Sequence, residues 1–130
     1  MKKQKIKITI TKEDTGYSAT GLVDDNFIAT EAETFEELKA MILEAVNLTF
    51  EDQGIVYTID EIKLEYDLES FFDFYKVINA KALSERIGMN QSLLAQYIKG
   101  SKKPSPVQTK RILKGVQQIG KELSEVSFLL

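Results

Sequence analysis

The spacing of apolar residues changes abruptly at about Leu68, and this change constrains the fold more than any other feature of the sequence. Before it, short segments alternate between apolar and polar residues, as in Ile6-Lys7-Ile8-Thr9-Ile10. After it, apolar residues recur every three or four positions. Alternation with period two is typical of strands with one buried face, and the longer spacing is typical of helices. The sequence therefore predicts an α+β domain over 1–67 and an all-α domain over 68–130.

Acidic and basic residues divide at the same place. Residues 1–67 contain 7 Lys/Arg and 15 Asp/Glu, a net charge of −8, and residues 68–130 contain 10 and 5, a net charge of +5; together they give the −3 of the whole chain. Such asymmetry favours nucleic acid as the ligand of the basic part and a different partner for the acidic part.

The first domain is predicted to be a β-β-β-α-β layer with one helix on one sheet. Its helix should begin at Phe35, because Thr34-Phe35-Glu36-Glu37 has the pattern of a capping box, and end near Phe50. Turn residues separate the strands before it, and Gly16 can take a positive φ. The predicted strands are 6–11, 17–23, 27–30 and an alternating segment from Ile62 to Leu68.

The second domain is predicted to contain four helices. The last three carry capping signals: Asn, Ser or Pro at the start, and Gly after the end of the second and third. The helices are expected from Leu68 to about Val77, from Lys81 to Ile87 after the cap Asn79, from Asn90 to Gly100, and from Ser105-Pro106 onward.

The second and third of these helices form the element that predicts function. A tight turn between them needs a small residue at their contact, for which we expect Ala82, and a corner residue that tolerates positive φ, for which we expect Gly88. Four apolar residues are spaced to pack the pair against its neighbours: Leu83, Ile87, Leu94 and Ile98.

The polar residues left over suit a DNA major groove. Gln can bond adenine at two atoms, Ser can bond several base edges, and Ala can touch a thymine methyl group. The predicted base contacts are Gln91, Ser92, Ala95 and Gln96. Phosphate contacts are expected at the start of the same helix and just beyond its end. These residues are Asn90, Lys99, Lys102 and Lys103.

The segment from Ala82 to Ser105 resembles the helix-turn-helix of phage-repressor-like (Xre-family) regulators. The residues that carry the resemblance are Leu83-Ser84, Gly88, Gln91-Ser92, Gly100, Lys102-Lys103 and Pro104-Ser105. The resemblance implies double-stranded operator DNA as the ligand and transcriptional repression as the function.

The first domain resembles the HicB antitoxin family. The resemblance lies in Lys5-Ile6-Lys7-Ile8, in Asp14-Thr15-Gly16-Tyr17-Ser18-Ala19, and in Thr34-Phe35-Glu36-Glu37-Leu38 followed by Glu44-Ala45. It implies a truncated ribonuclease-H-like fold, repression of the protein's own operon, and a small, RNA-cleaving toxin of the HicA type as partner. A basic toxin would be attracted by the acidic domain.

Catalysis is not expected. The chain has no histidine and no cysteine, which removes the usual general base and the usual metal ligands. Two-metal chemistry of the ribonuclease H type needs a carboxylate on the first strand, which offers only Lys, Ile and Thr. We expect no cofactor, no metal and no membrane segment. The basic N-terminus runs into alternating Ile-Lys-Ile instead of an apolar stretch, so we expect no signal peptide and a cytoplasmic protein.

The last helix is expected to contribute to a homodimer or a higher homo-oligomer. Its apolar residues extend further than a four-helix domain needs, and operators read by such domains usually have two-fold symmetry. The predicted dimer contacts are Ile119, Leu123 and Val126, with the early part of the helix in the domain core.

Three functions are compatible with these features. The preferred one is an antitoxin-type repressor that binds operator DNA and a toxin. The second is a regulator whose first domain senses a ligand or only oligomerises. The third is a protein-interaction adaptor that does not bind DNA.

Overall fold

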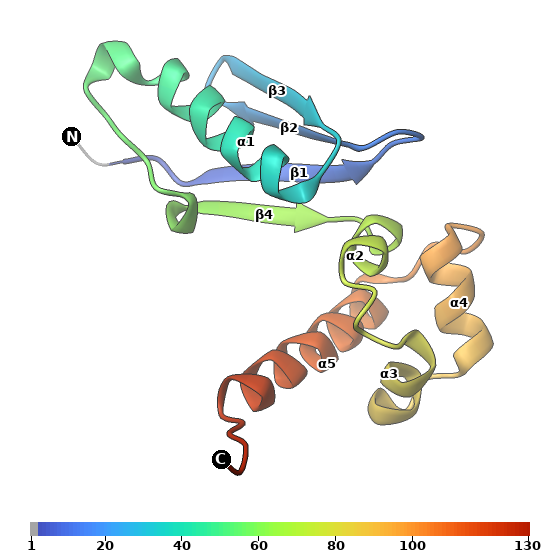
Figure 1. Ribbon diagram of the computed structural model, residues 1–130. Coiled ribbons are helices and arrows are strands. Elements are labelled where there is room, and N and C mark those ends of the chain that lie inside the picture. Colours follow the sequence, from blue (N-terminus) through green and yellow to red (C-terminus); the bar gives the residue numbers. More distant parts are fainter. Residues whose placement is uncertain (1–2) are drawn as a thin grey trace. The chain divides into compact units, whose positions relative to one another are not determined.

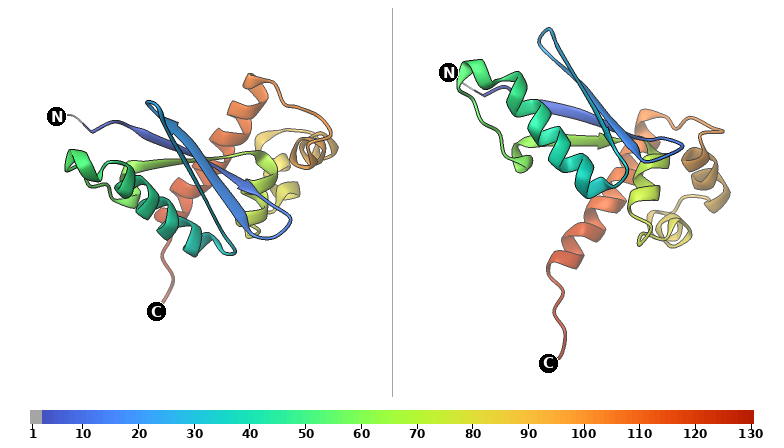
Figure 2. Two further views of the ribbon diagram at one scale, coloured as in Figure 1. Left: turned by 90° about the horizontal axis from the view of Figure 1, so that it is seen from above. Right: turned by 45° about the horizontal axis from the view of Figure 1, so that its top comes forward.

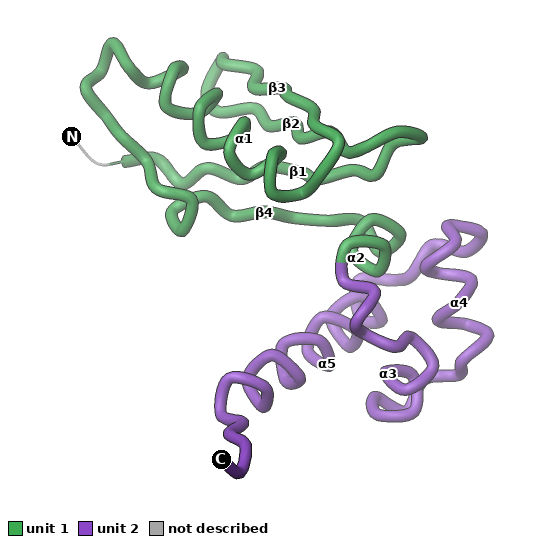
Figure 3. The backbone as a smooth tube through the Cα atoms, in the orientation of Figure 1, with its two compact units in different colours: residues 1–74 green, residues 75–130 purple. Residues whose placement is uncertain are grey.

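The computed structural model describes residues 3–130 and divides the chain into two compact units, residues 1–74 and residues 75–130 (Figure 3). The first unit combines a sheet with helices, and the described elements of the second are helices only (Figure 1). The α+β layout is therefore confirmed. The division falls after Phe74, whereas the sequence places it after Asp67.

The sheet of the first unit has the strand order β3-β2-β1-β4. The first three strands form an antiparallel meander, and β4 pairs with β1 in parallel. The β-β-β-α-β order of the elements is as predicted, and β3 is longer than the segment 27–30 that the sequence indicates. The strands are β1 (Ile6–Lys12), β2 (Tyr17–Val23), β3 (Asn26–Ala32) and β4 (Ile62–Tyr66).

Helix α1 (Phe35–Thr49) covers one face of this sheet (Figures 1 and 2). The Thr34 hydroxyl accepts the backbone N–H of Glu37 at 3.2 Å, so the predicted cap starts the helix. Apolar residues alternate along β1 and recur every three or four positions along α1. The apolar side chains of both elements therefore face each other in one layer. The core residues contributed by these two elements are Ile6, Ile8, Ile10, Leu38, Ile42 and Val46.

Two short 3₁₀ helices, Glu51–Gln53 and Ile59–Glu61, connect α1 to β4, and the sequence did not indicate them. Between them, the Asn47 side chain holds the backbone of Tyr57, accepting its N–H at 2.7 Å and donating to its carbonyl at 3.2 Å. This bonding satisfies polar backbone groups that no strand pairs.

Helix α2 (Leu68–Phe74) belongs to the first unit, which corrects its assignment to the second domain. The Ser70 hydroxyl accepts the backbone N–H of Lys12 at 2.8 Å, and the Asp73 carboxylate binds both Lys12 Nζ at 2.9 Å and the Tyr17 hydroxyl at 3.0 Å. The Phe74 ring stacks on Tyr17 with 4.2 Å between centroids. These partners lie more than fifty positions earlier in the sequence, so the local period could not reveal them.

The second unit contains α3 (Ala80–Ile87), α4 (Gln91–Lys99) and α5 (Pro106–Ser124). Each helix starts where the sequence places a cap, and the capping bonds of Asn79, Asn90 and Ser105 are all present. Gly88 and Gly100 end α3 and α4 in the left-handed region. Among residues 3–130, no helix is both long enough and apolar enough to span a membrane.

Candidate nucleic-acid interface

Helices α3 and α4 are joined by a three-residue turn, Gly88 to Asn90. Gly88 has φ 69°, a conformation that disfavours residues with a Cβ atom, as the sequence predicts for the corner. The N–H of Met89 donates to the Ser84 carbonyl at 2.9 Å, so the chain leaves α3 through a closed, hydrogen-bonded cap. The result is a compact helix pair with a defined corner.

Arg111 of α5 binds the backbone of this corner. Its guanidinium donates to the carbonyl oxygens of Ile87 at 2.8 Å and Gly88 at 3.2 Å, and also to the Gln108 side chain at 2.8 Å. Carbonyl groups at a helix C-terminus lack intrahelical partners and carry partial negative charge, which suits a cation. Arg111 therefore positions the turn that precedes α4. Nothing in the local sequence pattern indicates this role.

The small buried residue of α3 is Ser84 and not Ala82. Ser84 is 1% exposed and its hydroxyl donates to the Lys81 carbonyl at 2.6 Å, whereas Ala82 is exposed. The correction has a simple cause: with Ala80 as the first residue of α3, the inward face passes through Leu83 and Ser84 and leaves Ala82 on the surface.

A close approach between α3 and α5 depends on Gly115. This glycine is buried in the middle of α5, and a Cβ atom added there would lie 2.4 Å from Cγ2 of Ile87 and 3.2 Å from Cδ1 of Leu83. Of the four apolar residues predicted to lock the pair, Leu83 and Leu94 are buried, while Ile87 and Ile98 are half-buried. Two further buried residues complete the packing of this region: Met89 and Tyr97.

The outward face of α4 carries the predicted base-contacting residues. Gln91, Ser92 and Gln96 are exposed, and Ala95, which lies among them on the helix surface, is half-buried. Residues three and four apart lie side by side on a helix surface, so Ser92 and Gln96 are neighbours and Lys99 continues the same row. The structure thus brings the predicted residues together on one surface, with Ala95 in a more enclosed position.

The start of α4 is arranged as the sequence suggests. The Asn90 side chain accepts the N–H of Leu93 at 3.1 Å. Among residues 3–130, no hydrogen bond is formed by the backbone N–H groups of Gln91 and Ser92. Such unpaired donors at a helix N-terminus attract an anion, because the helix dipole is positive there.

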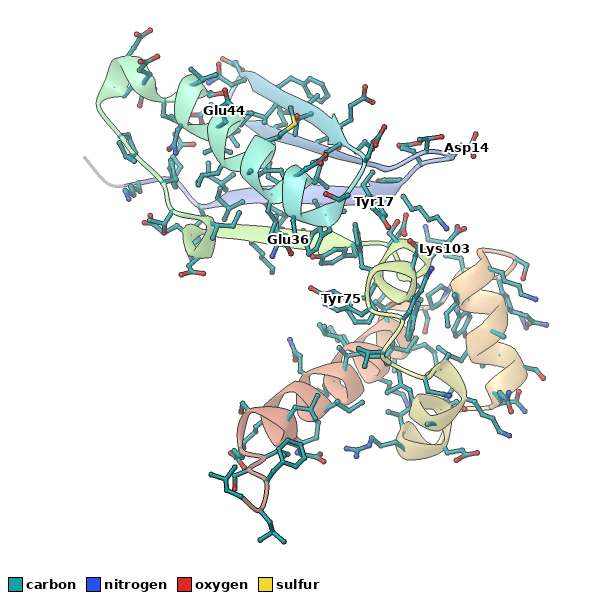
Figure 4. The ribbon with its side chains drawn as sticks, in the orientation of Figure 1. Asp14, Tyr17, Glu36, Glu44, Tyr75 and Lys103 are labelled. Atoms are coloured by element: carbon teal, nitrogen blue, oxygen red, sulfur yellow. The ribbon has the colours of Figure 1, made fainter. Side chains whose placement is uncertain are left out.

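The basic loop folds back onto the end of α4. The Gln96 carbonyl accepts both the Lys102 N–H at 3.3 Å and the Ser101 hydroxyl at 3.2 Å. This fixes the loop that carries Lys102 and Lys103 close to the last turn of the helix (Figure 4 labels Lys103). Both side chains and Lys99 are exposed, and within the described part of the chain none of the three forms an ion pair.

The predicted dimer contacts are placed differently from the expectation. Helix α5 ends at Ser124, so Val126 lies beyond it and does not continue the apolar row; its N–H bonds the Leu123 carbonyl at 3.2 Å. Ile119 is half-buried, while Leu123 and Val126 are 66% and 53% exposed. The apolar residues near the end of α5 therefore remain available on the surface.

The charge separation is sharper at the structural boundary than at the boundary read from the sequence. Residues 75–130 carry ten basic and three acidic residues, a net charge of +7; residues 1–74 carry seven basic and seventeen acidic residues, a net charge of −10. Acidic residues of the first unit include Asp14 in the β1–β2 turn and Glu36 and Glu44 on α1 (Figure 4). The two units therefore carry large net charges of opposite sign.

Residues 3–130 contain no group of His, Cys, Asp or Glu side chains that could hold a metal ion. No family model matches the chain, and comparisons with curated proteins and with solved structures find no match either.

Proposed function

We propose that the second unit is a helix-turn-helix domain that binds double-stranded operator DNA and represses transcription. The observation that carries the proposal is the exposed polar face of α4, with unpaired N–H groups at one end and a fixed basic loop at the other. A recognition helix meets base edges through its first turns, and cations and helix N-termini meet phosphates. The Xre-like residue pattern agrees with this use of the surface.

The proposal is tested by separating base contacts from phosphate contacts. Replacing Gln91 or Gln96 by Ala should cost about 1–3 kcal/mol on the selected operator and little on random DNA. Replacing Lys102 and Lys103 by Ala should weaken binding to every sequence and reduce the slope of log K against log salt by about 0.9 for each phosphate that is no longer neutralised. Fluorescence anisotropy over a salt series measures both. Equal losses on both DNAs after the Gln changes would show that α4 does not read bases.

Dimerisation through the exposed apolar residues at the end of α5 is part of the proposal. A two-fold operator requires two recognition helices about 34 Å apart, which one chain cannot supply. Changing Leu123 to Glu would place a charge in the apolar contact, and sedimentation should then detect monomer. A variant that stays dimeric would move the interface to another surface.

For the first unit we propose the antitoxin role that its HicB-like residues suggest. The β-β-β-α-β order with a parallel β1–β4 pair is compatible with a truncated ribonuclease-H-like fold. The net charge of −10 favours a small basic protein as partner, such as an RNA-cleaving toxin. Co-expression of the full chain with a small basic protein encoded beside it should restore growth. If no such protein is bound, the chain is a repressor without the antitoxin role.

A further inference from the structure

Among residues 3–130, no strand pairs with the outer edge of β3 in the sheet of the first unit. Strand β3 is the last strand in the order β3-β2-β1-β4 and pairs with β2 along all seven of its residues. Long edge strands are usually protected by Lys, Pro or a bulge. Strand β3 has none of these, whereas β4 at the opposite edge has five residues and includes Lys63. The outer side of β3 is thus open to another strand.

The register determines which backbone groups point outward. The β2–β3 turn has two residues, and Val23 lies opposite Asn26 where the turn closes. In such a hairpin the closing pair is hydrogen-bonded and the pairs alternate from there. The N–H and C=O groups of Phe27, Ala29 and Glu31 therefore point away from β2.

The two sides of this edge differ in chemistry. On the sheet face opposite α1, Phe27 lies across from Leu22, and both side chains are 70% exposed. On the α1 side, a cavity of about 410 Å³ lies beside the C-terminal end of β3, and three of its lining residues are acidic. On the face opposite α1, an added strand would meet Phe27 and Leu22, with Glu31 further along that face; on the α1 side it would meet the carboxylates of Glu33 and Glu37. The residues lining the cavity are Thr15, Glu31, Ala32, Glu33, Glu37 and Met41.

A second copy of this chain fits the edge poorly. An antiparallel pair of β3 strands centred on Ala29 would place Glu33 opposite Asp25 of the other copy, and like charges directly opposite each other are destabilising. Each first unit also carries a net charge of −10. A strand with basic side chains has the complementary charge.

We propose that the outer edge of β3 receives an extended segment of a basic protein partner, in which apolar residues alternate with Lys or Arg. The segment adds a strand to the sheet, bonds the outward backbone groups of Phe27, Ala29 and Glu31, and places its cations beside Glu33 and Glu37. This inference rests on the proposed function of the first unit, the binding of a basic protein, and it specifies the surface and the conformation of the bound segment.

The test uses the full-length protein and the synthetic peptide acetyl-Lys-Val-Lys-Val-Lys-Val-Lys-amide, which matches the length of β3. Amide hydrogen exchange followed by NMR should show that the N–H groups of Phe27, Ala29 and Glu31 become protected when the peptide is added. The N–H groups of Ile28 and Thr30, which face β2, should not change. The control peptide, with Glu in place of every Lys, should not bind.

Three variants locate the site. Ala29→Pro removes an outward N–H without touching the β2 ladder, so it should weaken peptide binding about tenfold or more; Ala29→Ser, which keeps the N–H, should bind like the natural protein. If Ala29→Pro does not fold, the double change of the exposed Glu33 and Glu37 to Lys replaces it and should have the same effect. The proposal would be overturned by absent binding, by protection at other amides, or by natural binding in Ala29→Pro or in the double Glu→Lys variant.

The native partner separates this inference from the proposed function. If Ala29→Pro still binds a basic partner that the natural protein binds, the edge is not the partner's site, although the antitoxin role stands. If the peptide adds to β3 but no basic protein partner exists, the edge site stands and the antitoxin role falls.

Discussion

The two units of this protein stabilise their folds in different ways. The first buries a continuous aliphatic layer between its sheet and α1, to which β1, β2, β3 and α1 all contribute. The second has a thinner interior, and its short helices depend on side-chain caps and on the close contact at Gly115. Its fully or nearly buried apolar residues are Leu83, Met89, Leu94, Tyr97 and Ile112. A unit with so small an interior presents most of its residues to solvent or to a ligand, and each buried group matters more.

The comparison extends to charge. Helix α2 carries Glu69 and Asp73, and its assignment to the first unit moves both acidic residues to the acidic side of the molecule. Asp73 also forms the bonds that attach α2 to the β1–β2 hairpin. The boundary of folding and the boundary of charge therefore coincide at residues 74–75. The two units thus differ in net charge as well as in fold.

The largest effect should come from truncating a buried side chain in the thinner unit. Leu94 is 1% exposed on α4, and Leu94→Ala should cost about 2–5 kcal/mol and abolish binding to operator and random DNA alike. The matched change in the first unit is Ile8→Ala, at a residue that is 0% exposed in β1. It should destabilise the sheet and leave DNA binding intact.

Hydrogen exchange of the two variants measures which unit opens in each. If Ile8→Ala abolished DNA binding as Leu94→Ala does, the prediction would be wrong, because the units would then unfold together.

A smaller effect is expected at the α3–α5 contact. Alanine at Gly115 would have its Cβ atom 2.4 Å from the branched side chain of Ile87, so Gly115→Ala should destabilise the second unit by about 1–3 kcal/mol. Gly120 in the same helix has no atom within 4 Å of such a Cβ. Gly120→Ala should therefore stabilise by up to about 1 kcal/mol, the gain in helix propensity. Thermal unfolding of both variants measures the two changes in stability, which should have opposite signs. Two changes of the same sign would mean that the helices do not approach closely at Gly115.

Local patterns predicted most of the elements of this fold. Capping residues located the starts of α1, α3, α4 and α5, because a cap depends only on the next three residues. Alternation located β1 and β4, and turn residues located β2 and β3, for a similar reason. The start of α2 at Leu68 was predicted, but its place in the first unit was not, because that place is set by bonds from Ser70 and Asp73 to residues distant in the sequence. The end of α5 at Ser124 was also missed, because the apolar spacing continues past it.

The residues of the candidate interface also fall into a group that the sequence identified and a group that it did not. Its exposed residues could be identified because they are the polar remainder of an amphipathic helix, and Gln91 and Gln96 lie on the surface as expected. The residues that support the helix pair from α5 could not be identified. Arg111 reads as one more basic residue until its bonds to the corner carbonyls are seen, and Gly115 is an ordinary glycine until the distance to Ile87 is known.

A smaller effect is expected from removing helix caps, which compares the N-termini of α3 and α4 within the second unit. Asn90→Ala removes the bond to the Leu93 N–H at the start of α4, and Asn79→Ala removes the equivalent bond to Ala82 at the start of α3. Each should cost about 1 kcal/mol of stability, measured by urea denaturation. Only Asn90→Ala should also weaken DNA binding by more than this loss of folded protein explains. Equal binding by the two variants would show that the α4 N-terminus does not meet phosphate.

The smallest effect concerns acid, and each unit offers one carboxylate for it. Hydrogen bonding from Lys3, and then from the Thr58 N–H, lowers the pKa of Glu61 below its ordinary value of 4.5. Hydrogen bonding from Arg86, and then from Gln118, does the same to the pKa of Glu122.

A carboxyl group whose pKa is lower in the folded state than in the unfolded state stabilises the fold above the unfolded value. Its contribution is lost as the pH falls through the folded value, so the relevant window opens at about pH 4.5 and extends downward. Both pairs are well exposed to solvent, and the effects should accordingly be small and reduced by salt. Glu61→Gln should reduce the loss of stability at low pH in the first unit alone. Glu122→Gln should do the same in the second unit alone. Amide exchange, followed at low salt as the pH is lowered, measures the stability of each unit. A change that spreads to the other unit would show that the two are coupled through a contact that neither carboxylate makes directly.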